Sequence, residues 1–313
     1  MKYGRYAAID IGTVTCRLLI ADIDVSGLHE IKRGYGITNL GDGVDATGLL
    51  KPEAIERLIN QVRQFQELIA LHQDANHKNI KVVVVATSAA RDAKNASVFL
   101  EALDSLGISL HIISGEKEAA LSFAGVSYDF PDENLLVVDI GGGSTECSAG
   151  YSGGQPLLNQ SFNVGCRRVT ERFLKSNPPA SEELLSARKW AHEVMKPYFE
   201  RLAASGFSVE RMVAVAGTAT SVVSIHKKMQ IYRASEVHRS VIEQKVLRDL
   251  YSEMKNMPLD QVKKIIGLDP GRAPVIVAGL LILDVVMELA QQKSFTASEA
   301  DILQGIILDT ATK

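Results

Sequence analysis

Glycines and hydroxyl residues follow an aspartate at residues 139–146, where the sequence reads DIGGGSTE. Glycines let backbone N–H groups approach an anion without a Cβ atom in the way, and the hydroxyls of Ser144 and Thr145 add two donors. The carboxylates of Asp139 and Glu146 are hard oxygen ligands of the kind that magnesium prefers. A glycine triplet alone would indicate only a tight hairpin, but these neighbours favour a phosphate-binding turn.

A weaker version of the same pattern lies at residues 10–15, which read DIGTVT. Alone, it indicates a hairpin whose aspartate supports the turn. Both copies consist of a strand, the letters DIG, a turn with hydroxyl residues and a second strand, which predicts an internal duplication of an α/β unit. Two such loops, the first with Thr13 and Thr15, would face each other across a cleft.

Two further candidate positions lie where a strand ends and a helix begins. Glu118 belongs to the first turn of one such helix, where acidic residues are common for electrostatic reasons alone. Gly217 and Thr218 open another helix, whose backbone N–H groups suit a phosphate or a nucleotide. A capped strand-to-helix turn explains Gly217 and Thr218 equally well.

The charged residues are divided unevenly along the 313-residue chain, whose net charge is −3. Residues 1–160 contain 13 basic and 20 acidic residues, whereas residues 161–313 contain 21 and 17. This split indicates either an anionic partner for the second half or chance scatter of solvated charges. Arg91, Arg167 and Arg168 are available to pair with a polyanion or to lie in solvent. A chain this mildly acidic is not expected to bind nucleic acid.

Apolar runs and helical periodicity predict the elements that must position these residues. Hydrophobic residues make up 46% of the chain and charged residues 23%, which excludes a disordered or collagen-like chain. The predicted strands are Tyr6–Ile11, Leu18–Ile23, Lys81–Ala86, Ile108–Ile113, Leu135–Ile140 and Met212–Ala216. The predicted helices are Pro52–His72, Ser97–Leu106, Glu116–Val126, Arg167–Lys175, Glu182–Ala203, Val241–Met254 and Pro274–Ala290.

Neither a disulfide framework nor a membrane segment is expected. The cysteines are odd in number and form no CxxC pair; they are Cys16, Cys147 and Cys166. The longest apolar run, residues 275–283, is shorter than the roughly 18 residues of a membrane span. No apolar signal region precedes the first expected strand, so we expect a cytoplasmic protein.

The motifs together resemble the Ppx/GppA phosphatases, a family of exopolyphosphatases and guanosine pentaphosphate phosphohydrolases. The resemblance rests on DIGT at 10–13, SGEKEA at 114–119, DIGGGSTE at 139–146, Gly165-Cys166 and AGT at 216–218. It implies an α/β fold of two ribonuclease-H-like domains flanking a cleft, as in actin, acetate kinase and sugar kinases. The implied domains are 1–124 and 125–298, with a C-terminal helix at about 299–313 that packs back on the first.

The resemblance also implies roles for individual residues. Glu118 matches the catalytic glutamate, a general base that activates the attacking water. Asp139 and Glu146, with Asp10 as a further candidate, would hold Mg²⁺ and the reacting phosphate. Arg167 and Arg168 would guide the rest of a polyanion. The candidate phosphate-binding residues are Thr13, Thr15, Arg91, Gly142, Gly143, Ser144, Thr145, Cys166, Gly217 and Thr218.

The leading functional prediction is a magnesium-dependent exopolyphosphatase that removes the terminal phosphate of inorganic polyphosphate by water attack. Guanosine pentaphosphate is the alternative substrate. A kinase of the acetate or sugar type is a second class. A non-catalytic polyphosphate or nucleotide sensor is a third, and its main support is Val14, where the family usually has asparagine. The family also suggests a homodimer.

Overall fold

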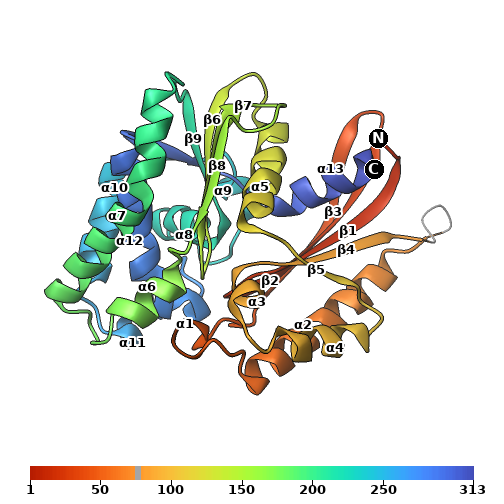
Figure 1. The fold of residues 1–313 in the computed structure, drawn as a ribbon, viewed down its shortest axis with the longest axis horizontal. Helices are drawn as coiled ribbons and strands as arrows, with labels where there is room; N and C mark the ends of the chain where they lie inside the picture. Colours follow the sequence, from red (N-terminus) through yellow and green to blue (C-terminus); the bar gives the residue numbers. More distant parts are fainter. Residues whose placement is uncertain (75–78) are drawn as a thin grey trace.

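The computed structural model describes residues 1–74 and 79–313 and contains two β-sheets with helices packed on their faces (Figure 1). The strands of the first sheet are β1 (Gly4–Ile11), β2 (Thr15–Asp24), β3 (Gly27–Ile37), β4 (Lys81–Ala86) and β5 (Leu110–Ile112). Those of the second are β6 (Asn134–Ile140), β7 (Thr145–Tyr151), β8 (Leu158–Phe162), β9 (Arg211–Val215), β10 (Val241–Glu243) and β11 (Ser294–Ala297).

The two sheets share one topology. The first has the strand order β3-β2-β1-β4-β5, and the second has β10-β11-β9-β6-β7-β8. In each, the strand that carries the aspartate pairs antiparallel with the next strand and parallel with a later one: β1 with β2 and β4, β6 with β7 and β9. The predicted duplicated α/β fold is confirmed.

The helices cover both sheets. The first sheet is accompanied by α1 (Val44–Thr47), α2 (Pro52–Leu71), α3 (Ser88–Asp92) and α4 (Ala96–Asp104). The remaining helices are α5 (Gly115–Asp129), α6 (Cys166–Phe173), α7 (Ser181–Ala204), α8 (Ala216–His226), α9 (Ala234–Val237), α10 (Gln244–Met254), α11 (Leu259–Val262), η1 (Pro270–Arg272), α12 (Ala273–Leu289) and α13 (Ile302–Thr312). None of those within the described residues is both long and apolar enough to cross a bilayer.

Several elements differ from the sequence prediction, and two of them lie at the edges of the sheets. The helix predicted from Val241 begins only at Gln244, because Val241–Glu243 form β10 and pair antiparallel with β11. Strand β3 was not predicted, since it lies at the edge of the first sheet and its exposed residues break the apolar pattern.

Because side chains alternate between the two faces of a strand, Asp10 of β1 and Asp139 of β6 both point toward α5. In β1, Ile9 and its odd-numbered neighbours pack toward α2 and α4, whereas Tyr6 and Ala8 pack toward α13 and the middle of α5. In β6, Leu135 and Val137 pack against α5, while the alternate residues face α7 and α12. Asp10 and Asp139 continue the α5-facing sets, so both carboxylates point into the space between the sheets.

Helices α5 and α13 fill that space and contact each other along their length (Figure 1). Helix α13 packs on β1, β2 and β4 of the first sheet, and α5 packs on β6, β7 and β8 of the second. The predicted domain boundary at residues 124 and 125 falls inside α5, so the division into domains stays a prediction. We call the first sheet with α1–α4 and α13 the first lobe, and the second sheet with α6–α12 the second lobe.

Glycines set how closely α5 and α13 approach. A Cβ atom at Gly305 would lie 1.9 Å from the Leu121 carbonyl oxygen, and one at Gly125 would lie 1.9 Å from that of Asp301. Because these neighbours are backbone atoms on another helix, any side chain would push the two helices apart.

We predict that Gly305→Ala lowers the free energy of unfolding by about 3 kcal/mol, since the added methyl overpacks the contact with α5. Denaturant unfolding followed by circular dichroism measures the change. Gly154→Ala is the matched control, because a Cβ there would be 3.4 Å from its nearest neighbour, the Tyr151 carbonyl oxygen. Equal stability of the two variants would contradict the close helix contact.

Candidate active site

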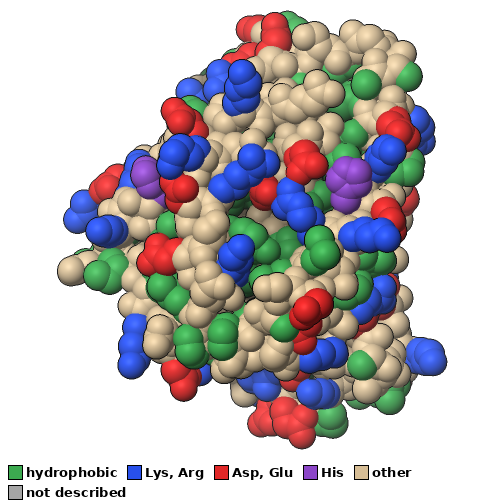
Figure 2. Space-filling model, turned by 90° about the vertical axis from the view of Figure 1, so that its left-hand side faces the viewer, with side chains coloured by type: hydrophobic (Ala, Val, Ile, Leu, Met, Phe, Trp, Pro, Cys, Tyr) green, Lys and Arg blue, Asp and Glu red, His purple; other side chains and the backbone are tan. Residues whose placement is uncertain are grey.

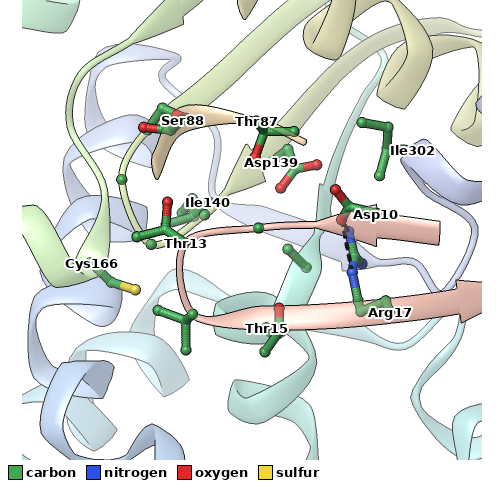
Figure 3. A pocket seen from close by; sticks show the side chains of 18 of the residues that line it. Asp10, Thr13, Thr15, Arg17, Thr87, Ser88, Asp139, Ile140, Cys166 and Ile302 are labelled. Carbon is green, nitrogen blue, oxygen red and sulfur yellow. Dashed lines mark hydrogen bonds and ion pairs between the residues drawn. The ribbon is translucent and has the colours of Figure 1, made fainter. Parts of the chain in front are cut away.

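The two glycine and hydroxyl turns face each other across a cavity of about 50 Å³ at the strand ends (Figure 3). The first turn joins β1 to β2 and the second joins β6 to β7. The predicted residues that line this cavity are Asp10, Thr13, Thr15, Glu118, Asp139, Gly142, Gly143, Ser144, Cys166 and Gly217. Residues from widely separated segments therefore converge on one small site.

The turns are in direct contact, which explains the need for glycine at 142 and 143. A Cβ at Gly142 would lie 2.6 Å from Val14 Cγ2, and one at Gly143 would lie 2.8 Å from Thr13 Oγ1. Val14 is itself buried and lines the cavity, so it contributes an apolar wall. Burial raises the pKa of the nearby Cys166, which keeps this side chain a neutral thiol.

Several predicted residues lie next to the cavity but do not line it. The buried Thr145 hydroxyl donates to the Val164 carbonyl oxygen at 2.5 Å, and Ser161 Oγ donates to Glu146 Oε1 at 2.6 Å. Thr218 is a buried residue of the first turn of α8. These three residues support the walls of the site.

Arg91 holds Glu118 in place. Arg91 Nη1 donates to Glu118 Oε2 at 2.7 Å and to the Ile113 carbonyl oxygen at 3.0 Å. Burial raises the pKa of Glu118 to about 8, against the opposing effect of Arg91. The ionised form of Glu118 is therefore a stronger base than an ordinary carboxylate, and Arg91 fixes its orientation.

Asp139 and Glu146 face each other in the register of β6 and β7. Burial raises the pKa of Asp139 to about 6, and burial together with the charges of Glu118 and Asp139 raises that of Glu146 strongly. Ser122, one helical turn after Glu118 in α5, donates its hydroxyl to Asp139 Oδ2 at 2.9 Å. One face of α5 therefore delivers both a candidate base and a donor to the carboxylates.

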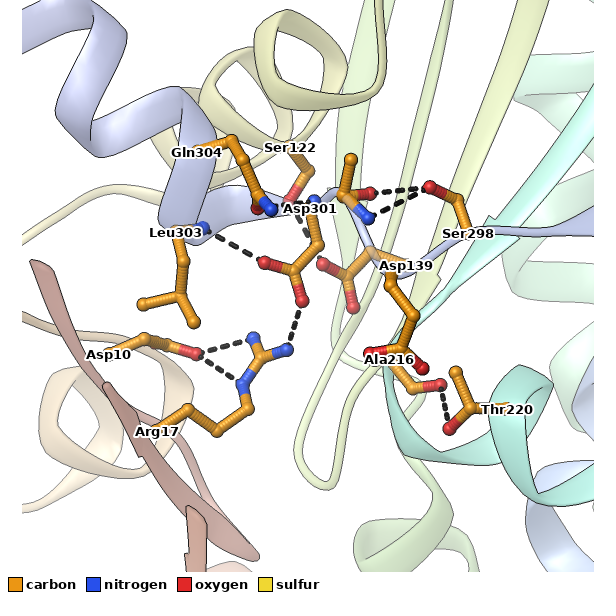
Figure 4. Close-up of polar contacts among 12 residues, drawn as sticks. Asp10, Arg17, Ser122, Asp139, Ala216, Thr220, Ser298, Asp301, Leu303 and Gln304 are labelled. Atoms are coloured by element: carbon orange, nitrogen blue, oxygen red, sulfur yellow. Dashed lines mark hydrogen bonds and ion pairs between the residues drawn. The ribbon is translucent and has the colours of Figure 1, made fainter. Parts of the chain in front are cut away.

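Arg17 connects the site to the C-terminal helix (Figure 4). Its Nη2 donates to Asp10 Oδ2 at 2.6 Å, and its Nη1 forms an ion pair with Asp301. Asp301 caps α13 by accepting the Leu303 N–H at 2.9 Å. Burial raises the pKa of Asp10, and the Arg17 guanidinium opposes that shift.

Residues that the sequence reasoning missed also line the cavity: Arg17, Thr87, Ser88 and Arg272. Arg17 had a detectable signal, because a hairpin turning at residues 12–14 places it opposite Asp10. Thr87 and Ser88 follow a predicted strand, which marks a loop at the same sheet edge. Arg272 had no local signal, since it reaches the cavity from η1.

The carboxylates fit a magnesium ion that shares its coordination with a substrate. No three His, Cys, Asp or Glu side chains of residues 1–74 and 79–313 converge as a complete metal cage. Mg²⁺ needs only one or two carboxylates when water and phosphate supply the other ligands. Asp10 Oδ1 is buried without a hydrogen-bond partner among these residues, and Asp139 has one oxygen engaged by Ser122. Glu146, outside the cavity lining, fits less well.

Arg167 and Arg168 face the first lobe. Arg168 pairs with Asp45 and Asp92, and Arg167 contacts Asn39 and Glu171. Figure 2 shows basic and acidic side chains interspersed over one face of the molecule, with no continuous basic surface there. Guidance of a polyanion by these two arginines stays a prediction.

A second cavity of about 690 Å³ opens beside the first. The two share Arg17, Ala216, Gly217 and Arg272 in their walls. Arg272 Nε donates to the Tyr35 hydroxyl at 3.2 Å, and its guanidinium lies 5.7 Å from the centroid of that ring. Arg272 thereby links the second lobe to β3 at the junction of the two cavities.

Comparisons with known proteins agree with these features. The sequence model of the Ppx/GppA phosphatase family matches residues 19–313. A bifunctional 3-dehydroquinate synthase/phosphatase of Fusobacterium nucleatum is 36% identical over 97% of this chain, which spans 46% of that relative's length. Exopolyphosphatase 2 of Mycobacterium tuberculosis is 35% identical over 99% of this chain and 100% of its own. The solved PPX-GPPA enzyme of Aquifex aeolicus superposes with a TM-score of 0.79 at 28% identity, covering 98% of this chain and 99% of that one.

Burial of Glu118 predicts a pH-dependent stability. Its pKa is raised from 4.5 to about 8 in the folded state, so folding favours the protonated form. The resulting stability is present below the ordinary pKa and is lost as the pH rises through this window. In metal-free and phosphate-free buffer, we expect the melting temperature to fall between pH 5 and pH 8, and to fall less in Glu118→Gln.

The exposed Glu116 supplies the control, since Glu116→Gln should retain the wild-type pH profile. A Glu118→Gln profile parallel to that of the wild type would show that Glu118 does not take up this proton.

Proposed function

The chain belongs to the Ppx/GppA phosphatase family of hydrolases, and from this premise we propose that it is a magnesium-dependent exopolyphosphatase. The observation that carries the proposal is a buried glutamate, Glu118, at a cavity lined by two loops suited to phosphate. A glutamate held by an arginine beside such loops suits the activation of water for attack on phosphorus.

In the proposed reaction, water attacks the terminal phosphorus while its proton passes to Glu118. A new P–O bond forms, the phosphoanhydride bond breaks, and the shortened chain leaves with the electron pair of that bond. Hydroxyl and backbone N–H groups of the two turns hold the terminal phosphate, and Arg91 orients Glu118. Bound Mg²⁺, held by Asp10 and Asp139, would neutralise the charge that develops on the phosphate oxygens.

The size of the first cavity favours attack at a chain end. Its volume of about 50 Å³ accommodates a few water-sized groups, which suits a terminal phosphoryl group better than an internal stretch of chain. The rest of the substrate would extend into the wider second cavity, whose wall includes Arg33 and Arg272.

Guanosine pentaphosphate is a second candidate substrate, and the second cavity favours it. A volume of about 690 Å³ lies in the range of sites for small organic ligands. Tyr35 and Tyr232 offer aromatic surface in its wall, and Arg33 and Arg272 offer positive charge. A nucleoside would occupy this cavity while its terminal phosphate entered the first.

We predict that Glu118→Gln nearly abolishes phosphate release from polyphosphate in the presence of Mg²⁺, by at least about 10²-fold, because water loses its proton acceptor. Release of orthophosphate measures the rate, and a polyphosphate binding assay confirms that the variant still binds. Glu116→Gln should act as the wild type does. Undiminished release by Glu118→Gln would exclude it as the base.

We predict that Ala234→Trp, which narrows the second cavity, separates the two substrates. Its kcat/KM for guanosine pentaphosphate should fall by about tenfold or more, because the nucleoside loses its space. Hydrolysis of tripolyphosphate, which carries no nucleoside, should fall far less. Ala234→Ser is the control for the substitution itself. Equal losses on both substrates would argue against a nucleoside subsite.

A further inference from the structure

Arg168 is enclosed at the seam between the lobes, and its side chain is only 11% exposed. Its Nε donates to the Gly143 carbonyl oxygen at 2.8 Å, and its Nη1 to Asp45 Oδ1 at 2.5 Å. Its Nη2 pairs with Asp92 of α3. The hydrogen-bonding capacity of this guanidinium is thus used by groups of the protein itself, whereas an arginine that binds a polyanion needs free donors.

The turn between β6 and β7, residues 141–144, is called the glycine turn here, and its carbonyl groups point toward α6. The Gly141 carbonyl oxygen accepts from Cys166 N at 3.0 Å, and that of Gly142 accepts from Arg167 N at 2.8 Å. Both of these donors belong to the backbone of the first helical turn. The third carbonyl, that of Gly143, accepts instead from the Arg168 side chain. Arg168 thus completes a row of three donors that fixes three successive peptide groups.

Because a peptide group is planar, fixing these three carbonyl groups also fixes the direction of the N–H group in each of the same peptides. In a trans peptide, the N–H points away from the C=O of the preceding residue. With the three carbonyls held by α6, the N–H groups of Gly142, Gly143 and Ser144 point away from α6, and all three residues line the first cavity. Within residues 1–74 and 79–313, these N–H groups have no protein acceptor. They are therefore free to bind a phosphate oxygen.

We propose that Arg168 is a positioning residue that holds the peptide group between Gly143 and Ser144 so that the Ser144 N–H faces the reacting phosphate. The inference rests on the proposed hydrolysis and deepens it. Asp45 and Asp92 of the first lobe fix the guanidinium, so the orientation of this donor depends on contact between the lobes. Removing Arg168 leaves the Gly143 carbonyl without its donor and lets the peptide rotate.

This role and polyanion guidance predict different kinetics. Loss of an oriented transition-state donor lowers kcat by about 10²-fold on every chain length. Loss of a guiding charge raises KM, and raises it more for long polyphosphates than for short ones. We therefore expect Arg168→Ala to lower kcat equally on tripolyphosphate and long polyphosphate. Arg168→Lys keeps the charge but not the three-way contact, so it should resemble Arg168→Ala.

Arg172→Ala is the matched control. Arg172 also pairs with Asp45, at 3.1 Å, but it is 42% exposed and its bonds go to Asp45 instead of the glycine turn. It should retain kcat and KM close to those of the wild type. The positioning role would be overturned in favour of polyanion guidance by two results together. In Arg168→Ala, kcat would be unchanged and KM would increase more for longer chains; in Arg168→Lys, KM would return to the wild-type value.

An orthophosphate titration tests the geometry without turnover. In isotopically labelled wild type, the amide resonances of Gly142, Gly143 and Ser144 should shift as orthophosphate binds. In Arg168→Lys, and in Arg168→Ala where it folds, the Ser144 shift should be lost while that of Gly142 remains. An unchanged Ser144 shift overturns the proposal, as does a wild type in which none of the three responds. A responsive wild type that hydrolyses no substrate would refute the proposed function alone.

Discussion

The burial of several carboxylates around one small cavity is the constraint on which the rest of this structure depends. A carboxylate removed from water must be paired, hydrogen-bonded or protonated. Arg17 and Arg91 provide the pairing, and serine hydroxyls from α5 and β8 provide hydrogen bonds. The compensation is incomplete, because burial still raises the pKa of each of these groups. The acidic residues concerned are Asp10, Glu118, Asp139 and Glu146. Such a site favours the arrival of a cation or the uptake of a proton.

The duplicated topology explains how the carboxylates come together. Asp10 and Asp139 occupy equivalent positions near the ends of β1 and β6, each on the face that packs against α5. Helix α5 then adds Glu118 from between the sheets, and α13 adds Asp301 through Arg17. The close glycine contact between these two helices brings the sheets near enough for Asp10, Glu118 and Asp139 to share one cavity.

Sequence reasoning predicted the parts of the site that depend on short contiguous patterns. The two DIG turns and the helix that carries Glu118 lie where the motifs and strand signals place them. Arg17 was accessible in principle through hairpin register. Arg272 was not, because its position depends on how η1 packs against β3 across the cleft. The helix predicted over Val241–Met254 is present, but its start was wrong by three residues, because a short edge strand paired with a distant segment leaves no periodic signal.

The difference between what a sequence pattern indicates and what three-dimensional contacts decide also applies to the charged residues. The excess of basic residues in the second half of the chain suggests a surface for polyanions, yet Arg167 and Arg168 are engaged by groups of the first lobe and of α6 itself. Their charge contributes to contact between the lobes. Arg272, by contrast, has no carboxylate partner among the described residues, and it lines both cavities. Because an ion pair carries little net charge, an arginine without a carboxylate partner at the junction of two cavities is a better guide to where the proposed phosphate chain would bind than the charge totals of the two halves of the sequence.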